Sequence, residues 1–92
     1  MGEFEGKILD LTVIVLIDPG ATLSYISPKV VEHCELQLVI FKNPWPVQLA
    51  TGAKRRVLAK VNNCPLNIAG QPMMADLNVL PLGSYDVLIG MD

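Results

Sequence analysis

The sequence has little charge, few cysteines and no apolar run long enough to span a membrane. Charged residues make up 17% of the 92 residues, and the net charge is −2, the wrong sign for a domain that binds nucleic-acid phosphates. The longest apolar stretch, residues 8–17, includes Asp10 and Thr12 and is far shorter than the ~20 residues of a membrane-spanning helix. We therefore expect neither nucleic acid nor a membrane as a partner.

The two cysteines, Cys34 and Cys64, lack the close spacing of a zinc ribbon or of a disulfide-rich secreted domain. The single histidine, His33, would point about 100° away from Cys34 on a helix, a poor arrangement for a shared metal. We expect a half-buried thiol at Cys34 and a surface imidazole at His33. The sequence therefore predicts a reducing, cytoplasmic setting, with no metal site and no cofactor.

Apolar residues are plentiful by contrast, at 51% of the chain. This content excludes disorder, and the short length leaves room for one small core. Because so few charges cover so small a body, we expect an apolar face that meets a partner, most simply a second copy. Residues 1–6 are expected to be a cloning remnant or an N-terminal tail, and residues 7–92 the single domain.

Short apolar runs separated by turn residues predict an all-β fold with one or two short helices. The run at residues 7–17 is rich in β-branched residues, and Asp10 can mark a tight turn within it. Ser27 and Pro28 supply an N-cap and a first-turn proline for a helix over residues 29–34. Antiparallel hairpins follow, with strands at 47–50, 56–61, 65–69 and 73–80, and turns at 51–52, 62–63 and 70–72. A second helix is expected to begin where the chain ends.

Asp18 is the residue that calls for a chemical explanation. A mainly apolar run delivers this carboxylate to a loop that also contains Pro19 and Gly20, and a charge is costly to desolvate without compensation. Asp before Pro-Gly most often hydrogen-bonds its own backbone in a turn. On spacing alone, this turn interpretation is favoured.

Two segments taken together resemble the retroviral-type aspartic proteases, especially those in the polyproteins of plant gypsy-type LTR retrotransposons. The first segment is Val15–Ser27 (VLIDPGATLSYIS), and the second comprises residues 75–82 (ADLNVLPL) and 85–92 (YDVLIGMD). An Asp-x-Gly-Ala motif alone is weak evidence. The apolar pair and glycine at residues 88–90 follow it at the family's distance, and the resemblance extends from about Lys7 to Asp92.

The resemblance implies a retropepsin-like closed β-barrel that is half an enzyme, since two identical chains each supply one Asp18 to a shared site. Two adjacent carboxylates cannot both ionise, so the pair holds one proton between them; aspartic proteases are the standard example of this behaviour. One carboxylate takes a proton from the attacking water while the other polarises the peptide carbonyl. The implied function is an aspartic endopeptidase that processes a retrotransposon polyprotein as a homodimer, in the cytoplasm or within retrotransposon particles.

The same resemblance implies roles for further residues. Substrate would be bound by the loop after Asp18 and by a flap at residues 48–54, whose contributions are Gly20, Ala21, Thr22, Ala50, Thr51 and Gly52. Structural support of the site would come from Pro19, Leu88, Ile89 and Gly90. Without the resemblance, residues 48–54 are an ordinary hairpin with a Thr-Gly turn.

Two departures from the family's pattern bear on activity. Pro19 stands where the family usually has Ser or Thr, so the hydroxyl that bonds across the dimer is absent. The terminal strands that generally join the two halves are also largely missing. These departures predict a weak or alternative dimer, and they motivate a second hypothesis, a catalytically inactive dimerisation or peptide-binding module. A small β-domain without any site is the third hypothesis.

Two further features have ordinary interpretations beside functional ones. The basic run Lys54–Arg56 is typical of a solvated hairpin face, although such runs also occur in nucleic-acid and nuclear-import patches. Trp45, between two prolines, is interpreted as a core anchor rather than a peptide-binding platform.

Overall fold

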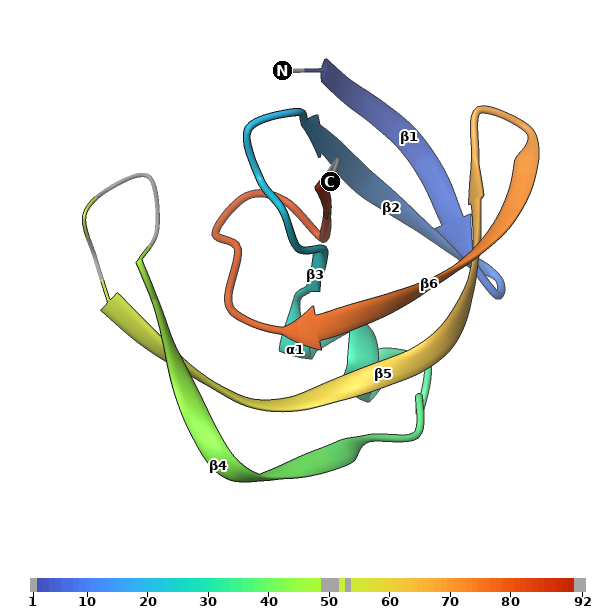
Figure 1. Ribbon diagram of the computed structural model, residues 1–92. Coiled ribbons are helices and arrows are strands. Elements are labelled where there is room, and N and C mark those ends of the chain that lie inside the picture. The colour runs from blue at the N-terminus through green and yellow to red at the C-terminus, as the bar shows by residue number, and fades with distance from the viewer. Residues whose placement is uncertain (1, 49–51, 53, 91–92) are drawn as a thin grey trace.

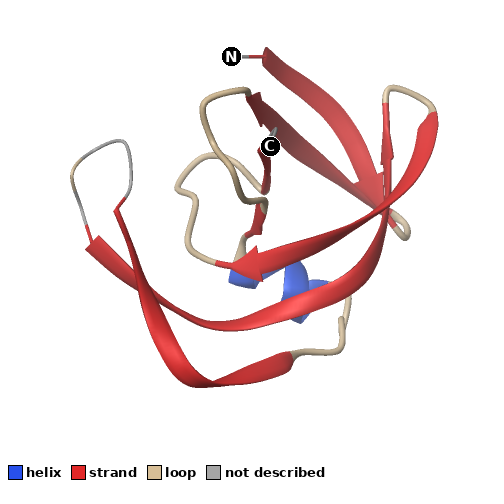
Figure 2. Ribbon diagram, viewed as in Figure 1, coloured by secondary structure: helices blue, strands red, loops and turns tan. Residues whose placement is uncertain are grey.

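The computed structural model describes residues 2–48, 52 and 54–90, and it contains one curved β-sheet with a single short helix in this part of the chain (Figures 1 and 2). The elements in chain order are β1 (Gly2–Ile8), β2 (Leu11–Asp18), β3 (Tyr25–Ile26), α1 (Pro28–His33), β4 (Val39–Gln48), β5 (Lys54–Ile68), β6 (Gln71–Val79) and β7 (Val87–Gly90).

The strands close into a ring. Their order is β1-β2-β7-β3-β6-β5-β4, and an additional pairing of β1 with β5 joins the first six of these strands into a closed circuit. β4 lies outside this circuit, along β5 (Figure 1). The β2–β7 and β3–β6 pairs are parallel and the other pairs are antiparallel. The mainly β, closed-barrel expectation is confirmed.

The core fills this ring with aliphatic side chains. Along β2, Val13 and Val15 are buried while Thr12 and Ile14 are exposed, the alternation of a strand with one wet face. Full burial of such a side chain contributes roughly 1.5–3 kcal/mol. Other buried members of the core are Ile8, Ile26, Val30, Val31, Val61, Cys64, Leu66, Leu77 and Val87.

The predicted helix is confirmed. Ser27 is the N-cap of α1, and its side chain accepts a hydrogen bond from the Lys29 N–H at 3.3 Å. Pro28 occupies the first turn, where its missing N–H costs nothing. Val30 and Val31 of the helix are buried in the core.

The first apolar run forms a hairpin. β1 and β2 pair from Gly2↔Ile17 to Ile8↔Leu11, and Asp10 lies in the turn, as expected. Residues 2–6, which the sequence assigns to a tail, belong to β1. A Cβ atom on Gly6 would lie 2.7 Å from the Asn67 carbonyl oxygen of β5, so this glycine permits the close approach that closes the ring.

The expected turn at residues 62–63 is wrong. β5 continues through both asparagines, and its register with β6 shifts between Val61 and Cys64. Asn63 has φ 51°, and its N–H donates to Asp76 Oδ1 at 2.9 Å. Asparagine tolerates this left-handed conformation, and here it forms a bulge because pairing with β6 resumes on the far side.

Two further differences concern the ends of strands. β4 begins at Val39, eight positions before the predicted start at residue 47, because an edge strand tolerates Pro44 and Pro46. The expected start of a second helix, where the chain ends, lies outside the described residues, and Val87–Gly90 form β7 between β2 and β3. Pairing on both sides favours a strand for this apolar segment.

Candidate active site

Asp18 stands at the end of β2 and is half-buried. Its Oδ1 accepts a hydrogen bond from the Gly20 N–H at 2.9 Å, and its carbonyl oxygen accepts one from the Ala21 N–H at 3.1 Å. The turn interpretation therefore describes the local geometry of this loop. The same N–H dipole compensates the carboxylate's charge, so the turn and a chemical role for Asp18 are compatible.

Gly90 of β7 lies directly beside Asp18 in the parallel β2–β7 pair. A Cβ atom at this position would collide with the carbonyl oxygens of Leu23 and Ala21. Only glycine therefore lets β7 lie against the loop that follows Asp18. This close packing fixes the loop from behind.

Ser24 links that loop to the rest of the sheet, and the sequence analysis assigned it no role. Its Oγ accepts a hydrogen bond from the Gly90 N–H at 3.1 Å. Its carbonyl oxygen accepts bonds from the Asn78 backbone N–H at 2.9 Å and from Asn78 Nδ2 at 3.2 Å. Ser24 falls within the matched segment Val15–Ser27, but the pairing with Asn78 spans 54 positions and leaves no local signal.

The Asp18 loop borders a hollow of about 320 Å³. The structure brings together here five of the predicted site residues: Asp18, Gly20, Ala21, Thr22 and Leu88. Gln48, the first residue of the predicted flap, also lines the hollow. Sequence reasoning missed the remaining lining residues, which come from three separate segments, namely Tyr25, Val47, Leu80 and Leu82. A larger hollow of about 720 Å³ lies near Leu9, Met73 and Met74, but Lys7 is its one titratable lining residue in the described part of the chain.

The other predicted site residues lie at the edges of this hollow or beyond it. Pro19 is exposed in the loop, and Ile89 pairs with Ile17 and packs against the core. Gly52 is exposed, with φ 88°, between β4 and β5. Ala50 and Thr51 lie outside the described residues. β4 and β5 form the expected antiparallel hairpin, with Gln48 opposite Lys54, and its role as a flap stays a prediction.

The hollow is chemically asymmetric. Asp18 is its one carboxylate among the described lining residues, so a single chain supplies one acid. Tyr25 also lines the hollow, and burial raises the pKa of its phenol above the ordinary value of 10.0. Leucines at 80, 82 and 88 form the apolar part of the wall. A hollow with one carboxylate and both polar and apolar lining residues is compatible with a site that needs a second carboxylate from another chain.

Comparison with known proteins identifies the family. The family model of the retroviral aspartyl proteases matches residues 6–92. The chain belongs to the retroviral aspartyl protease family. Among solved structures, this family member resembles the crystal structure of the retroviral protease-like domain of Ddi1 from Leishmania major, with a TM-score of 0.75 and 22% sequence identity over 98% of this chain and 71% of that chain. This likeness confirms the retropepsin-like fold. A search of curated proteins found no match.

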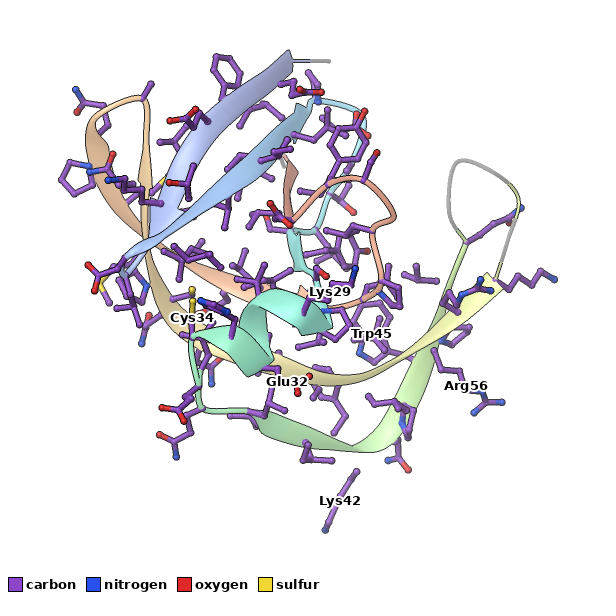
Figure 3. The ribbon with its side chains drawn as sticks, turned by 180° about the vertical axis from the view of Figure 1, so that it is seen from behind. Lys29, Glu32, Cys34, Lys42, Trp45 and Arg56 are labelled. Atoms are coloured by element: carbon purple, nitrogen blue, oxygen red, sulfur yellow. The ribbon has the colours of Figure 1, made fainter. Side chains whose placement is uncertain are left out.

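The remaining candidate features do not line the Asp18 hollow of this protease-family domain. The basic run Lys54–Arg56 is exposed, and Figure 3 shows Arg56 pointing away from the sheet. Trp45 is half-buried against Phe41, with ring centroids 6.1 Å apart. The core-anchor expectation for Trp45 is wrong because β4 lies outside the ring that encloses the core.

The thiols are free, with Cys64 buried, Cys34 half-buried and His33 exposed. Burial raises the pKa of both thiols, and the Cys34 charge adds to the effect at Cys64. Among the described residues, no three metal-binding side chains gather in one place. α1, the helix that the structure describes, is too short to cross a membrane.

Proposed function

We propose that this protein is an aspartic endopeptidase that acts as a homodimer, with Asp18 of each chain forming the catalytic pair. The observation that carries the proposal is the placement of Asp18. Its carboxylate borders a hollow, and one carboxylate oxygen accepts a hydrogen bond from the Gly20 N–H. Gly90, which has no side chain, lets β7 pack closely against the loop after Asp18. Membership of the retroviral aspartyl protease family supports the same chemistry.

The proposed reaction needs two carboxylates because each has a different task. The ionised Asp18 removes a proton from a water whose oxygen attacks the peptide carbonyl carbon. The protonated Asp18 of the second copy donates its proton to the carbonyl oxygen, which gives a neutral tetrahedral diol. The C–N bond then breaks as the amine takes a proton from the first carboxyl, while the second carboxylate removes a proton from one diol hydroxyl. The products are a carboxylic acid and an amine, and the pair again holds one proton. The apparent pKa values of this reaction belong to the pair.

The hydrogen bond from the Gly20 N–H is compatible with these two roles of the carboxylates. It restrains Asp18 Oδ1 and leaves Oδ2 to face the water or the second carboxyl. Because the donor is a backbone N–H with a fixed position, this hydrogen bond disfavours rotation of the Asp18 carboxylate. Fixed orientation is what proton transfer to and from a bound water requires.

The substrate we propose is a polypeptide held in an extended conformation, within the polyprotein of a plant gypsy-type LTR retrotransposon. The β4–β5 hairpin is the proposed flap, because Val47 and Gln48 at the end of β4 reach the Asp18 hollow. An extended peptide pairs readily with exposed backbone groups of such a hairpin. The two free thiols support an intracellular setting.

Self-association is proposed to be weak. Pro19 has neither a hydroxyl nor an N–H to offer a second copy, and it is exposed beside Asp18. Exposed apolar side chains are nevertheless available for a partner, among them Phe4 and Ile14 on the β1–β2 hairpin. Sedimentation over a range of protein concentrations measures this equilibrium directly.

Cleavage of peptide libraries at about pH 5 tests the proposal, with the protein concentrated enough to dimerise. Asp18→Asn is expected to lower kcat by about three orders of magnitude, because the substituted amide cannot exchange the proton. Asp10→Asn is the matched control, since Asp10 is an exposed turn residue between β1 and β2. Equal cleavage by Asp18→Asn and wild type would overturn the proposal, and so would a strict monomer that cleaves nothing.

The second candidate is a protease-like module that binds peptides or dimerises without catalysis. Pro19 is the observation that favours it, because the usual contact across the dimer is lacking. This candidate predicts no cleavage by wild type or Asp18→Asn, with undiminished partner binding by both. Loss of binding in Asp18→Asn would count against it.

A further inference from the structure

Tyr25 is a second polar residue that lines the hollow bordered by Asp18. β3, which contains it, consists of two residues and lies between two longer strands. Tyr25 pairs with Leu88 of β7 on one side and with Asn78 of β6 on the other. Its backbone is therefore held on both sides, and the phenol stands on a rigid support two strands away from Asp18.

The Tyr25 phenol is also kept in its neutral, protonated form. Tyr25 is half-buried, and this burial raises its pKa above the ordinary value of 10.0. The hydroxyl therefore stays neutral over the acidic and neutral pH range. A neutral phenol both donates and accepts a hydrogen bond.

The rest of the wall restricts what the hollow can hold. Leu80, Leu82 and Leu88 favour an aliphatic stem, whereas Thr22 and Gln48 add neutral polar groups. The Asp18 carboxylate on the same wall disfavours a second negative charge nearby. The matching occupant has an aliphatic stem and a neutral end that forms hydrogen bonds.

We propose that Tyr25 is a specificity-determining residue whose hydroxyl selects a substrate side chain such as glutamine over the similarly shaped but apolar methionine. This inference rests on the proposed function, because it assigns the hollow to a side chain of the cleaved or bound peptide. Glutamate is rejected in turn by the Asp18 charge. Tyr25 is half-buried and so keeps some contact with water. The selection is therefore moderate, about tenfold, as for a single hydrogen bond that replaces one to water.

The test uses peptides that differ at one position. A library is cleaved by the wild-type protein and the products are identified by mass spectrometry, and the best sequence is then made with glutamine, methionine or glutamate at each position in turn. At the position that enters the hollow, wild type is expected to favour glutamine about tenfold over methionine in kcat/KM. Tyr25→Phe, which removes only the hydroxyl, is expected to reduce this ratio to about one.

Tyr85→Phe is the matched control. Tyr85 is also half-buried, but it precedes β7 and does not line the hollow. It is expected to keep the glutamine-to-methionine ratio of wild type. An unchanged ratio in Tyr25→Phe, with cleavage intact, would overturn the inference and leave the proposed function standing.

Binding separates the two proposals if cleavage fails. The same peptides are titrated into Asp18→Asn by fluorescence anisotropy, and binding needs no proton transfer. Tighter binding of the glutamine peptide that depends on Tyr25 would support the inference while the enzymatic proposal falls. Equal binding of the glutamine and methionine peptides, with or without the Tyr25 hydroxyl, would overturn the inference independently of catalysis.

Discussion

The Asp18 loop and the β4–β5 hairpin meet at the same hollow but are held in opposite ways. β2 carries Asp18 between two neighbouring strands, with buried side chains at Val13, Val15 and Leu16. Among the described residues, β4 pairs with β5 alone, and none of the β4 side chains is buried. Local opening costs least where few buried contacts would be lost. A firmly held carboxylate is thus combined with a wall that can move at low cost, which suits the proposed polypeptide substrate.

The largest expected effect on stability comes from adding a methyl group beside the firmly held Asp18 loop. Gly90→Ala places a methyl group against the Leu23 and Ala21 carbonyl oxygens, and backbone atoms there cannot yield without displacing the loop. We expect a loss of about 3 kcal/mol in the free energy of unfolding, measured by urea denaturation.

The control for this substitution is Gly70→Ala. Gly70 has φ 82° and open space around its Cβ position, so only the backbone strain of about 1 kcal/mol is expected. Equal losses for the two variants would show that the loop yields easily, and the stated contrast between the two regions would then fail.

Truncation of one side chain in each region gives the next effect. Val15 is 0% exposed and Ile40 is 69% exposed. Val15→Ala is expected to lower the free energy of unfolding by about 2 kcal/mol through lost burial and a cavity. Ile40→Ala is expected to change it by less than about 0.5 kcal/mol. Thermal unfolding of the pair sharpens the contrast, and a large loss for Ile40→Ala would show that β4 is held more firmly than its exposure indicates.

The smallest effect concerns pH. Burial raises the pKa of the Cys34 and Cys64 thiols above 9.0, so the folded chain retains protons that the unfolded chain loses. The resulting stability is present below pH 9.0 and is lost as the pH rises through the raised folded-state values. Urea denaturation in this alkaline range is expected to show a steeper decline for wild type than for Cys34→Ser/Cys64→Ala. Parallel declines would contradict this effect of burial.

Local chemistry made part of the fold predictable. Ser27 and Pro28 determine where α1 begins, and the β-branched run before Asp18 indicates the strand that delivers it. The turn chemistry of Asp18 with Gly20 is also local, since the two atoms belong to residues two positions apart. These features depend on neighbours in the sequence, which a pattern can reveal.

Features that depend on distant pairing escaped prediction. The asparagines at 62 and 63 have turn composition, yet pairing with β6 keeps them within one strand. The lining residues Tyr25, Leu80 and Leu82 come together with Asp18 only through the order of the strands. No periodicity carries that order, so this half of the site became visible only in three dimensions.

The prolines in β4 have a consequence for solubility at high concentration. The unpaired N–H and C=O groups of an exposed edge strand can pair with a strand of another chain, and such pairing can start aggregation. β4 is such an edge, yet Pro44 and Pro46 remove two N–H donors from its ten residues, and its register with β5 shifts between Ile40 and Trp45. An incoming strand would find an interrupted template, so we expect this apolar chain to be concentrated without forming aggregates along this edge.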